Sequence, residues 1–314
     1  MTSIRQIAKL AGYAPSTVSR YLNGSGYVSK KATAKIQAVI KQVDYMPSQI
    51  ARDLSQGSTK RIGVVIPHTK HPYFIEIIRG LLEASKSSNY QLLFLPSDYD
   101  LTLEHAYLEQ LHAKTFDALI FTSRTVSLNT IASYTKYGNI VCLEPVTSKK
   151  ISAVYLERTV GYTDLFTWLK TKHCQKYALL FSRNEDQSST FLETLATFND
   201  ILGPVTYQTF GQVGTYADGQ KLFQTLSQAN FDCIVANSDE LAVGLYQAYT
   251  QAQKQPPVIV SQSKQLVGQF FTIPTIDDHA FLLGKKAFES ALGPAGTNLS
   301  LATTFIDRTK KELP

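Results

Sequence analysis

Apolar and polar positions follow two different patterns along the chain. Residues 3–45 carry three short patterns with helical spacing, whereas from Arg61 onward short apolar runs alternate with helical patterns of about 10–15 residues. The apolar runs predict strands at Ile62–Ile66, Gln91–Leu95, Ala118–Phe121, Ile140–Leu143, Tyr177–Phe181, Val205–Thr209, Cys233–Ala236 and Val258–Val260. Helices are expected at about 73–88, 102–114, 160–172, 189–201, 216–229 and 240–253. This alternation indicates parallel sheets with helices on both faces, in which ligands bind beyond the carboxyl ends of the strands.

The first helical pattern begins at Ser3. Ser3 and Gln6 have the spacing of a capping box, in which each side chain bonds to the backbone amide of the other residue. Ile7, Ala8 and Ala11 then form one apolar face, and Gly12 suits a left-handed helix end.

Two further helices are expected after this turn. Pro15 has the backbone angle required at a first helical position, and Val18 and Leu22 share an inner face that leaves Arg20 outside. Ser29 can cap a third helix. Its inner positions are Ala32, Ile36, Val39 and Ile40, and its outer positions are Lys30, Lys31, Lys35 and Lys41. The arrangement predicts a helix-turn-helix whose second helix fits the major groove of DNA.

The positive charge lies almost entirely in this first part. Residues 1–61 hold ten Lys and Arg against two Asp, a net charge of +8, whereas the whole chain carries +6. A basic segment on a nearly neutral remainder is typical of a nucleic-acid reader joined to a second function. The alternative is an ordinary solvated charged face.

Length and composition exclude several other classes. The 314 residues suffice for about two domains, and 44% hydrophobic residues can form a sizeable core. No run of about 18 apolar residues is present, and the start lacks the features of a secretory signal, so we expect a cytoplasmic protein without a membrane span. Three widely spaced cysteines without a CxxC argue against a zinc knuckle or a disulfide scaffold.

Enzyme signatures are also absent from the sequence. It contains no GxGxxG, GxxxxGK(S/T), GxSxG or HExxH, and its two S-x-x-K matches, at Ser133 and Ser261, lack partner motifs. His68 and His71 stand three residues apart, but no third metal ligand can be placed, so solvent-facing histidines are expected. We therefore expect no catalytic residue, no metal and no other cofactor.

Four linked motifs near the start are characteristic of one family. They read I-x-x-I-A-x-L-A-G from Ile4, S-T-V-S-R-x-L-N over Ser16–Asn23, V-S-x-x-x-T from Val28, and Y-x-P-x-x-x-A-R-x-L over Tyr45–Leu54. With this spacing the segment resembles the N-terminal module of the LacI/GalR family of bacterial transcription regulators. The resemblance continues more loosely along nearly the whole chain.

The resemblance implies roles for individual residues of the module. Pro15 and Ser16 match positions that read base edges, and Arg20 matches the arginine that contacts guanine, whose O6 and N7 accept its two parallel bonds. Ser3, Thr17, Ser19 and Asn23 match phosphate-contacting positions. Ala14 stands where the family often has a capping serine, so one helix amide is left for a phosphate.

A short hinge helix is implied at about residues 47–55. Alone it is too short to be stable, and in the family it folds on operator DNA. Leu54 matches the leucine that opens the central base step in the minor groove.

For the remainder, the resemblance implies two α/β lobes like those of a periplasmic sugar-binding protein, with an effector between them and a dimer along one side. Tyr73 and Phe74 match an aromatic position of the cleft, although packing beneath the first helix is an equal alternative. Ser123 and Glu144 end strands at the same rim. Asp239 matches an acidic position beside the pocket.

Two departures from the family pattern concern the effector. The stretch Gln187–Phe191 lacks the arginine that binds the inducer, and Ser261–Ser263 replaces the G-F-D that carries the sugar-binding aspartate. Losing both removes the strongest groups for holding a sugar. A glycoside, a phosphorylated compound, a nucleoside, a protein co-regulator or a vestigial pocket therefore stay open.

These observations together predict a dimeric repressor of carbohydrate uptake or metabolism genes that binds a palindromic operator. Residues 1–57 form the helix-turn-helix domain with its hinge, and residues 61–314 form the two-lobed effector-binding and dimerisation domain. The alternative is a regulator with a non-sugar effector or a protein co-regulator. Two other classes, a small-molecule receptor with an incidental basic segment and a fused enzyme, are disfavoured by the missing signal sequence and the missing catalytic motifs.

Overall fold

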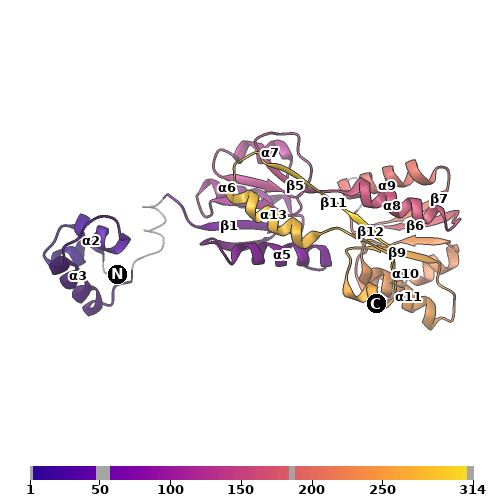
Figure 1. The fold of residues 1–314 in the computed structure, drawn as a ribbon, viewed down its shortest axis with the longest axis horizontal. Coiled ribbons are helices and arrows are strands. Elements are labelled where there is room, and N and C mark those ends of the chain that lie inside the picture. Colours follow the sequence, from indigo (N-terminus) through magenta and orange to yellow (C-terminus); the bar gives the residue numbers. More distant parts are fainter. Residues whose placement is uncertain (1–2, 47–56, 184–187, 310–314) are drawn as a thin grey trace. The chain divides into compact units, whose positions relative to one another are not determined.

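Three helices form the first part of the chain: α1 (Ile4–Ala11), α2 (Pro15–Asn23) and α3 (Lys30–Gln42), shown in indigo in Figure 1. The computed structural model describes residues 3–46, 57–183 and 188–309. The chain divides into two compact units, Met1–Lys60 and Arg61–Pro314, which we call the head and the body.

The head has its own small core. Ile7, Val18 and Ile36, one from each helix, are completely buried. Leu22 and Ile40, predicted to face inward, are partly buried against this core. The predicted caps are confirmed: Ser3 and Gln6 form the capping box, Gly12 adopts a left-handed conformation at the end of α1, and Ser29 caps α3. These local signals fix where each helix begins and ends.

The first lobe of the body is a six-stranded parallel sheet with helices on both faces. Its strands are β1 (Arg61–Ile66), β2 (Gln91–Pro96), β3 (Ala118–Phe121), β4 (Asn139–Cys142), β5 (Ser152–Glu157) and β11 (Asn298–Ala302), in the order β11-β5-β4-β3-β1-β2. Its helices are α5 (Pro72–Ser85), α6 (Leu101–His112), α7 (Leu128–Tyr134) and α13 (Ala280–Leu292). We call it the N-lobe.

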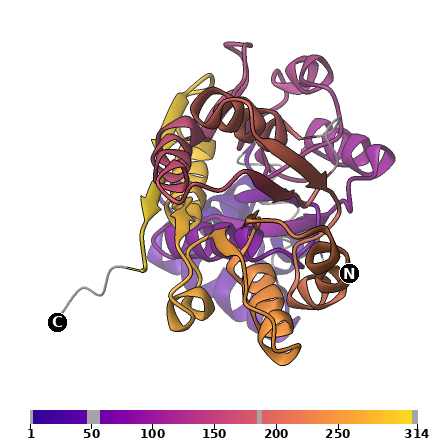
Figure 2. The same cartoon turned by 90° about the vertical axis from the view of Figure 1, so that its right-hand side faces the viewer.

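The second lobe, the C-lobe, repeats this plan and is seen end-on in Figure 2. Its strands are β6 (Lys176–Leu180), β7 (Thr206–Phe210), β8 (Cys233–Val235), β9 (Val258–Gln262), β10 (Thr275–Asp277) and β12 (Thr304–Ile306), in the order β12-β10-β9-β8-β6-β7. Its helices are α8 (Arg158–Lys170), α9 (Ser189–Leu202), α10 (Tyr216–Ala229), α11 (Asp239–Gln251) and α12 (Leu266–Phe270). Only the edge strand β12 is antiparallel to its neighbour among the strands of these two sheets that the structure describes.

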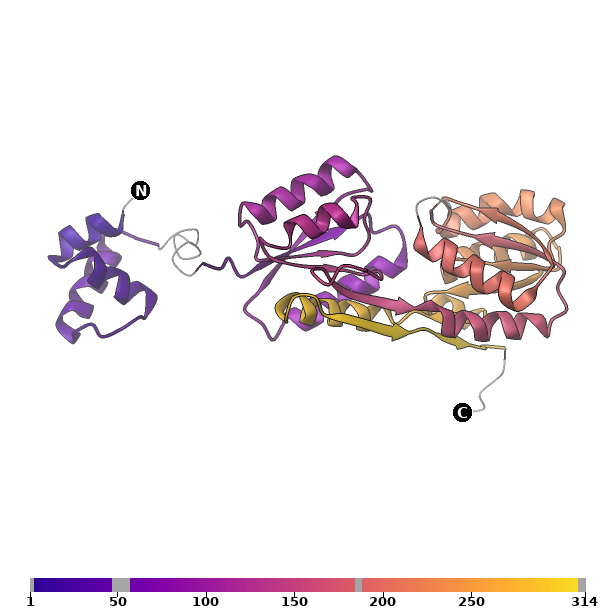
Figure 3. The ribbon, with the colours of Figure 1, turned by 90° about the horizontal axis from the view of Figure 1, so that it is seen from above.

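The chain passes between the lobes three times, as Figure 3 shows. β5 of the N-lobe leads directly into α8 of the C-lobe at Glu157 and Arg158. The chain returns between β10 and α13, and it crosses again at Thr303 between β11 and β12. The Thr303 hydroxyl lies within hydrogen-bond distance of the Gly161 amide and of the Glu157 and Arg158 carbonyls, so two of the three crossings are tied together.

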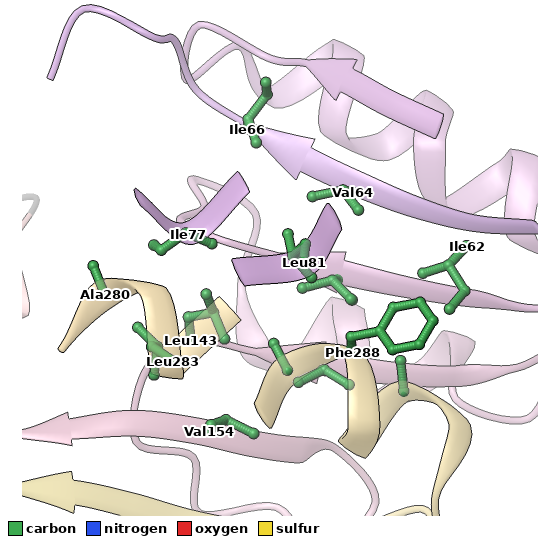
Figure 4. Close-up of a cluster of buried hydrophobic side chains, with 14 of the residues drawn as sticks. Ile62, Val64, Ile66, Ile77, Leu81, Leu143, Val154, Ala280, Leu283 and Phe288 are labelled. Carbon is green, nitrogen blue, oxygen red and sulfur yellow. The ribbon is translucent and has the colours of Figure 1, made fainter. Parts of the chain in front are cut away.

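Apolar residues cover both faces of each sheet. Figure 4 shows the N-lobe face on which α5 and α13 pack, with Ile77 and Leu81 from α5 against Leu283 and Phe288 from α13. On the opposite face α6 and α7 are packed. In the C-lobe, α8 and α9 cover one face of the sheet and α10 and α11 the other.

The predicted α/β architecture with a helix-turn-helix is confirmed. All eight predicted strands and all six predicted body helices are present, with ends shifted by a few residues. The elements β5, β10, β11, β12, α7, α12 and α13 were not predicted from the sequence. Across the described residues, no helix combines the length and apolar character needed to cross a lipid bilayer.

Candidate nucleic-acid interface and effector site

The residues expected to read bases lie exposed on α2. Pro15 begins this helix, Ser16 follows it, and Arg20 lies one turn further along, all accessible to solvent. Because Val18 is buried in the head core, the side of α2 that bears Arg20 points outward. The exposed face is therefore small and polar, with one guanidinium that can reach a base edge.

The residues expected to contact phosphates surround this face. Ser3 and Asn23 are exposed, whereas Thr17 and Ser19 are half-buried, and the Asn23 side-chain amide donates to the Ser19 hydroxyl at 3.4 Å. Ala14 provides no side-chain bond to the start of α2, as expected. An uncapped helix start leaves amide groups for a phosphate oxygen.

The basic side chains of α3 also point outward. Lys30, Lys31, Lys35 and Lys41 are all exposed, which confirms the predicted outer face. The predicted hinge helix at about 47–55 and its Leu54 lie outside the described residues.

A cavity of about 570 Å³ lies between the two lobes. Four predicted effector residues line it: Tyr73 and Phe74 at the start of α5, Ser123 after β3, and Glu144 after β4. The cavity therefore lies at the carboxyl ends of the parallel strands, where the fold predicts a ligand. Tyr73 is only partly buried and reaches the cavity, while Phe74 is 7% exposed and also packs in the N-lobe core, so its two expected roles coexist.

Three arginines line the same cavity, and sequence analysis predicted none of them there. Arg124 Nη2 donates to Glu144 Oε2 at 2.9 Å and Nη1 donates to the Val126 carbonyl at 2.8 Å. Arg158, at the start of α8, forms a 3.3 Å ion pair with Glu193 of α9. The Arg183 guanidinium lies over the Tyr99 ring, 4.1 Å from its centre.

Asp278 is a further lining residue that was not predicted as a ligand. It lies at the second crossing between the lobes, where its carboxylate accepts from the Ser263 hydroxyl at 3.0 Å and from the Ala280 amide at 3.2 Å. Burial raises the pKa of Asp278 to about 6, because a charged carboxylate is poorly solvated there. Burial likewise raises the pKa of Tyr162 to about 12 and that of Tyr73 further, so both phenols keep their protons.

Two side-chain contacts join the lobes across the cavity. His71 caps α5 through its Nδ1, which accepts from the Tyr73 amide at 3.2 Å, and its Nε2 lies 3.2 Å from the carbonyl of Asn237 in the C-lobe. Arg183 of the C-lobe stacks on Tyr99 of the N-lobe. Burial lowers the pKa of His71 to about 4, so the neutral ring donates from Nε2 and accepts at Nδ1.

The expectation of solvent-facing histidines is therefore wrong for His71 and His68. Both are partly buried, and the His68 ring contacts Phe74 and Tyr99 edge-on. The described residues contain no group of three or more His, Cys, Asp or Glu side chains arranged to hold a metal ion.

The expectation that Asp239 binds the effector is also wrong in this structure. Asp239 is completely buried and does not line the cavity. Its carboxylate accepts from Arg308 at 2.8 Å, from the Gln265 amide at 2.7 Å and from the Thr275 hydroxyl at 3.0 Å, and it also bonds Ser261. Asp239 thereby ties α11 to the residues after β9 and β12, which is a structural role.

Two of the cavity residues that were not predicted share one property. Arg158 and Asp278 each lie at a crossing between the lobes, just where a strand leads into a helix of the other lobe. No local pattern predicts these crossings, because they depend on which lobe each strand joins. The sequence signal was indirect, because the charged ligands that the family resemblance implies are absent from Gln187–Phe191 and Ser261–Ser263.

Comparison with known proteins identifies both units. Residues 3–48 match the family model of bacterial regulatory proteins of the lacI family, and residues 59–293 match that of periplasmic binding proteins and the sugar binding domain of the LacI family. The chain is 28% identical to catabolite control protein B of Bacillus subtilis over 97% of this chain and 99% of that protein. It is also 28% identical to the ribose operon repressor of Halalkalibacterium halodurans, over 82% of this chain and 78% of that protein.

Solved structures share the fold. A lac repressor dimer bound to operator and the anti-inducer ONPF superimposes with a TM-score of 0.77 at 17% identity, covering 97% of both chains. A LacI family transcriptional regulator from Enterococcus faecium with bound ribose gives a TM-score of 0.68 at 20% identity, covering 78% of this chain and 96% of that one. At these identities the likeness concerns the fold alone.

Proposed function

Because the chain belongs to the LacI family of bacterial regulatory proteins, we propose that it is a dimeric repressor whose hold on a palindromic operator is set by a small molecule between its lobes. The exposed polar face of α2, with Arg20 at its centre, is the observation that carries this proposal. Two copies of this helix, related by two-fold symmetry, match two half-sites one turn of DNA apart.

At the head, we assign base contacts to Pro15, Ser16 and Arg20. Pro15 has no donor and offers only apolar contact, whereas Arg20 can make two bonds to one guanine. Phosphate contacts are assigned to Ser3, Thr17, Ser19 and Asn23, and the minor-groove wedge to Leu54. Residues 1–57 act as the DNA-binding domain, and a DNA partner places the protein in the cytoplasm.

In the body, residues 61–314 act as the effector-binding and dimerisation domain. A ligand that binds better to one arrangement of the lobes shifts the population toward it, and only that difference in affinity can drive the response. Tyr73, Phe74, Ser123 and Glu144 are positioned to contact the ligand. The name of the ribose operon repressor supports a sugar or a sugar derivative as the effector. A nucleoside or a protein co-regulator is the alternative.

We assign the body no catalysis. Its cavity contains charged groups held in ion pairs and a neutral histidine that joins the lobes, and both are suited to binding. Regulation by binding also agrees with the family models that cover both units.

Selection of DNA from a random duplex library by the purified full chain tests the function. The expected result is enrichment of a palindrome, bound more tightly than a scrambled duplex of equal length. Its affinity should fall steeply with salt, since each phosphate contact releases counterions. Equal binding of palindromic and scrambled duplexes, with and without a metabolite extract, would contradict the proposal.

A further inference from the structure

We propose that the ligand of the interlobe cavity is a hydroxylated small molecule with an acidic group, a phosphate or a carboxylate, which Arg158 and Arg183 bind. This inference rests on the proposed function, because it names the chemistry of the effector. It replaces the missing arginine of the family pattern with two arginines at other positions.

Arg124 is the lining arginine that pairs with a carboxylate of the cavity wall itself. It donates to Glu144 at 2.9 Å, and a second donor bonds the Val126 carbonyl at 2.8 Å. Glu104, which is completely buried, accepts the Thr125 and Val126 amides and so fixes the loop that carries Arg124. The Arg124–Glu144 pair is therefore a neutral, rigid part of the wall.

Arg158 retains capacity for a ligand. Its side chain is 12% exposed, and its bond to Glu193, at 3.3 Å, uses one of its five N–H donors. Glu193 does not line the cavity, whereas Arg158 does. Tyr73 and Tyr162 also line it, and because burial raises the pKa of both phenols they keep their protons. The remaining N–H groups of the guanidinium and the two phenol O–H groups can all donate to an oxyanion, which is stabilised by several donors.

Arg183 adds a second guanidinium from the other side of the cavity. The Arg183 guanidinium lies over the Tyr99 ring, which holds the charge at the wall of the cavity. A bound anion that contacts Arg183 would also draw together the two lobes that this stack joins. Ligand binding and lobe closure are coupled in this way.

The cavity is lined by fewer carboxyl groups than guanidinium groups. Apart from Glu144, Asp278 is the lining carboxyl among the described residues, and it already accepts two hydrogen bonds. Four helices, α5, α8, α9 and α13, also begin at or within two residues of the lining residues His71, Arg158, Ser188 and Asp278. The partial positive charge of these helix starts favours an anion.

The ligand also needs hydroxyl groups. Asn237 is 6% exposed, lines the cavity, and its Oδ1 has no hydrogen-bond partner among the described residues, although its Nδ2 donates to the Val213 carbonyl at 2.6 Å. A buried acceptor without a donor is costly, and a ligand hydroxyl would satisfy it. A ligand with an acidic group that binds the two arginines and a hydroxyl group that donates to Asn237 is a sugar acid or a sugar phosphate.

The test uses the full chain and the fluorescence of Trp168, the one tryptophan of the sequence, which lies in α8 of the body. Its signal reports unfolding of the body and not phosphate bound to the basic head. Inorganic phosphate is titrated at constant ionic strength. The midpoint of the unfolding transition of the body should rise with the phosphate concentration and then level off as the site saturates. Arg158→Gln and Arg183→Gln should each lower the affinity of the body for phosphate at least tenfold. Arg158→Lys should lower this affinity by a smaller factor. Arg79→Gln is the matched control, because Arg79 is 63% exposed on α5 and pairs with Glu76.

A second arm compares D-glucose, D-gluconate and D-glucose 6-phosphate at equal concentration. A charged sugar should stabilise the body more than glucose does, and the better of the two identifies a carboxylate or a phosphate. The proposal is overturned if neither phosphate nor a charged sugar gives a saturable rise, or if the Arg158 and Arg183 variants respond like the wild type. Palindrome binding is measured on the same preparations, so loss of the repressor function is seen separately.

Discussion

Arg20 is the side chain that best distinguishes sequence-specific recognition of DNA from non-specific binding. Arg20→Ala should reduce the affinity for the selected palindrome until it approaches that for scrambled DNA, because a bidentate arginine–guanine pair discriminates by about 1–3 kcal/mol. Competition binding with both duplexes measures the ratio.

Lys31→Ala provides the contrast, since Lys31 is exposed on α3 and is suited to a phosphate. It should weaken binding to both duplexes equally. It should also reduce the slope of the logarithm of the affinity against the logarithm of the salt concentration by about one. Equal loss on both duplexes in Arg20→Ala would make Arg20 a phosphate contact instead.

The Asp239–Arg308 pair sets a second expectation at the residue scale. Arg308→Ala should lower the free energy of unfolding of the body by about 3–5 kcal/mol, because it leaves the completely buried Asp239 carboxylate without its cation. Denaturant unfolding followed by Trp168 measures this loss. Lys286→Ala removes an exposed ion pair with Glu289 and should change stability by less than about 1 kcal/mol. A change as small in Arg308→Ala would refute the structural role of the pair.

The candidate site was predictable where a residue follows a strand that the sequence reveals. Ser123 and Glu144 follow β3 and β4, whose continuous apolar runs identify them, so both were placed at the rim and line the cavity. Asp239 also follows an evident strand, β8, but it turns into the C-lobe, where Arg308 from the far end of the chain covers it. Such a long-range partner leaves no local trace in the sequence.

At the scale of elements, predictability depended on burial and on turn residues. β1 and β3 are buried along nearly their whole length and read as apolar runs, whereas β11 alternates exposed and half-buried positions at a sheet edge. β5 was missed because it runs into α8 without an intervening glycine or proline. A partly exposed strand such as β11 and a direct strand-to-helix junction such as that between β5 and α8 therefore give weak apolar-run and turn signals, although the edge strands β2 and β7 were predicted from their apolar residues.

The contact between α5 and α13 gives a prediction at this scale. The two helices pack so closely that a Cβ atom on Gly284 would lie 2.2 Å from the Ile77 carbonyl oxygen, and one on Gly80 would lie 2.0 Å from the Phe281 carbonyl oxygen. Gly284→Ala should therefore force the helices apart and lower the free energy of unfolding by about 1–3 kcal/mol, despite the better helix propensity of alanine. Glu289→Ala, on an exposed side chain of the same helix, is the control. Equal stability of Gly284→Ala and the control would contradict this packing.

At the scale of the whole body, the three crossings explain why one cavity can control the arrangement of two lobes. Arg158, Asp278 and Thr303 each lie at one crossing, and all three line the cavity. A ligand that contacts them touches the segments about which the lobes turn. His71 and Arg183 add side-chain contacts between the lobes. Because both side chains line the cavity, we expect the charge there to affect the stability of the body.

The pH dependence of the body should show this sensitivity through two opposing groups. The pKa of His71 falls from 6.5 to about 4 on burial, so the folded body binds fewer protons than the unfolded chain between these values and His71 lowers stability as the pH falls below 6.5. The pKa of Asp278 rises from 3.8 to about 6, so its contribution is complete below 3.8 and is lost as the pH rises through 6. Between pH 6 and 4 the two contributions oppose each other, each with a slope of up to about 1.4 kcal/mol per pH unit.

Relative to the wild type, the free energy of unfolding of His71→Gln should therefore rise as the pH falls from 6 to 4, and that of Asp278→Asn should fall. Lys70 and the His68 ring lie on the same loop as His71 and stay in both variants, so their contributions are common to the curves that are compared. His173→Gln, on an exposed loop after α8, is the control, and its free energy of unfolding should follow the pH dependence of the wild type. If the curves of all three variants run parallel to that of the wild type, burial does not shift the pKa of His71 or of Asp278 as we expect.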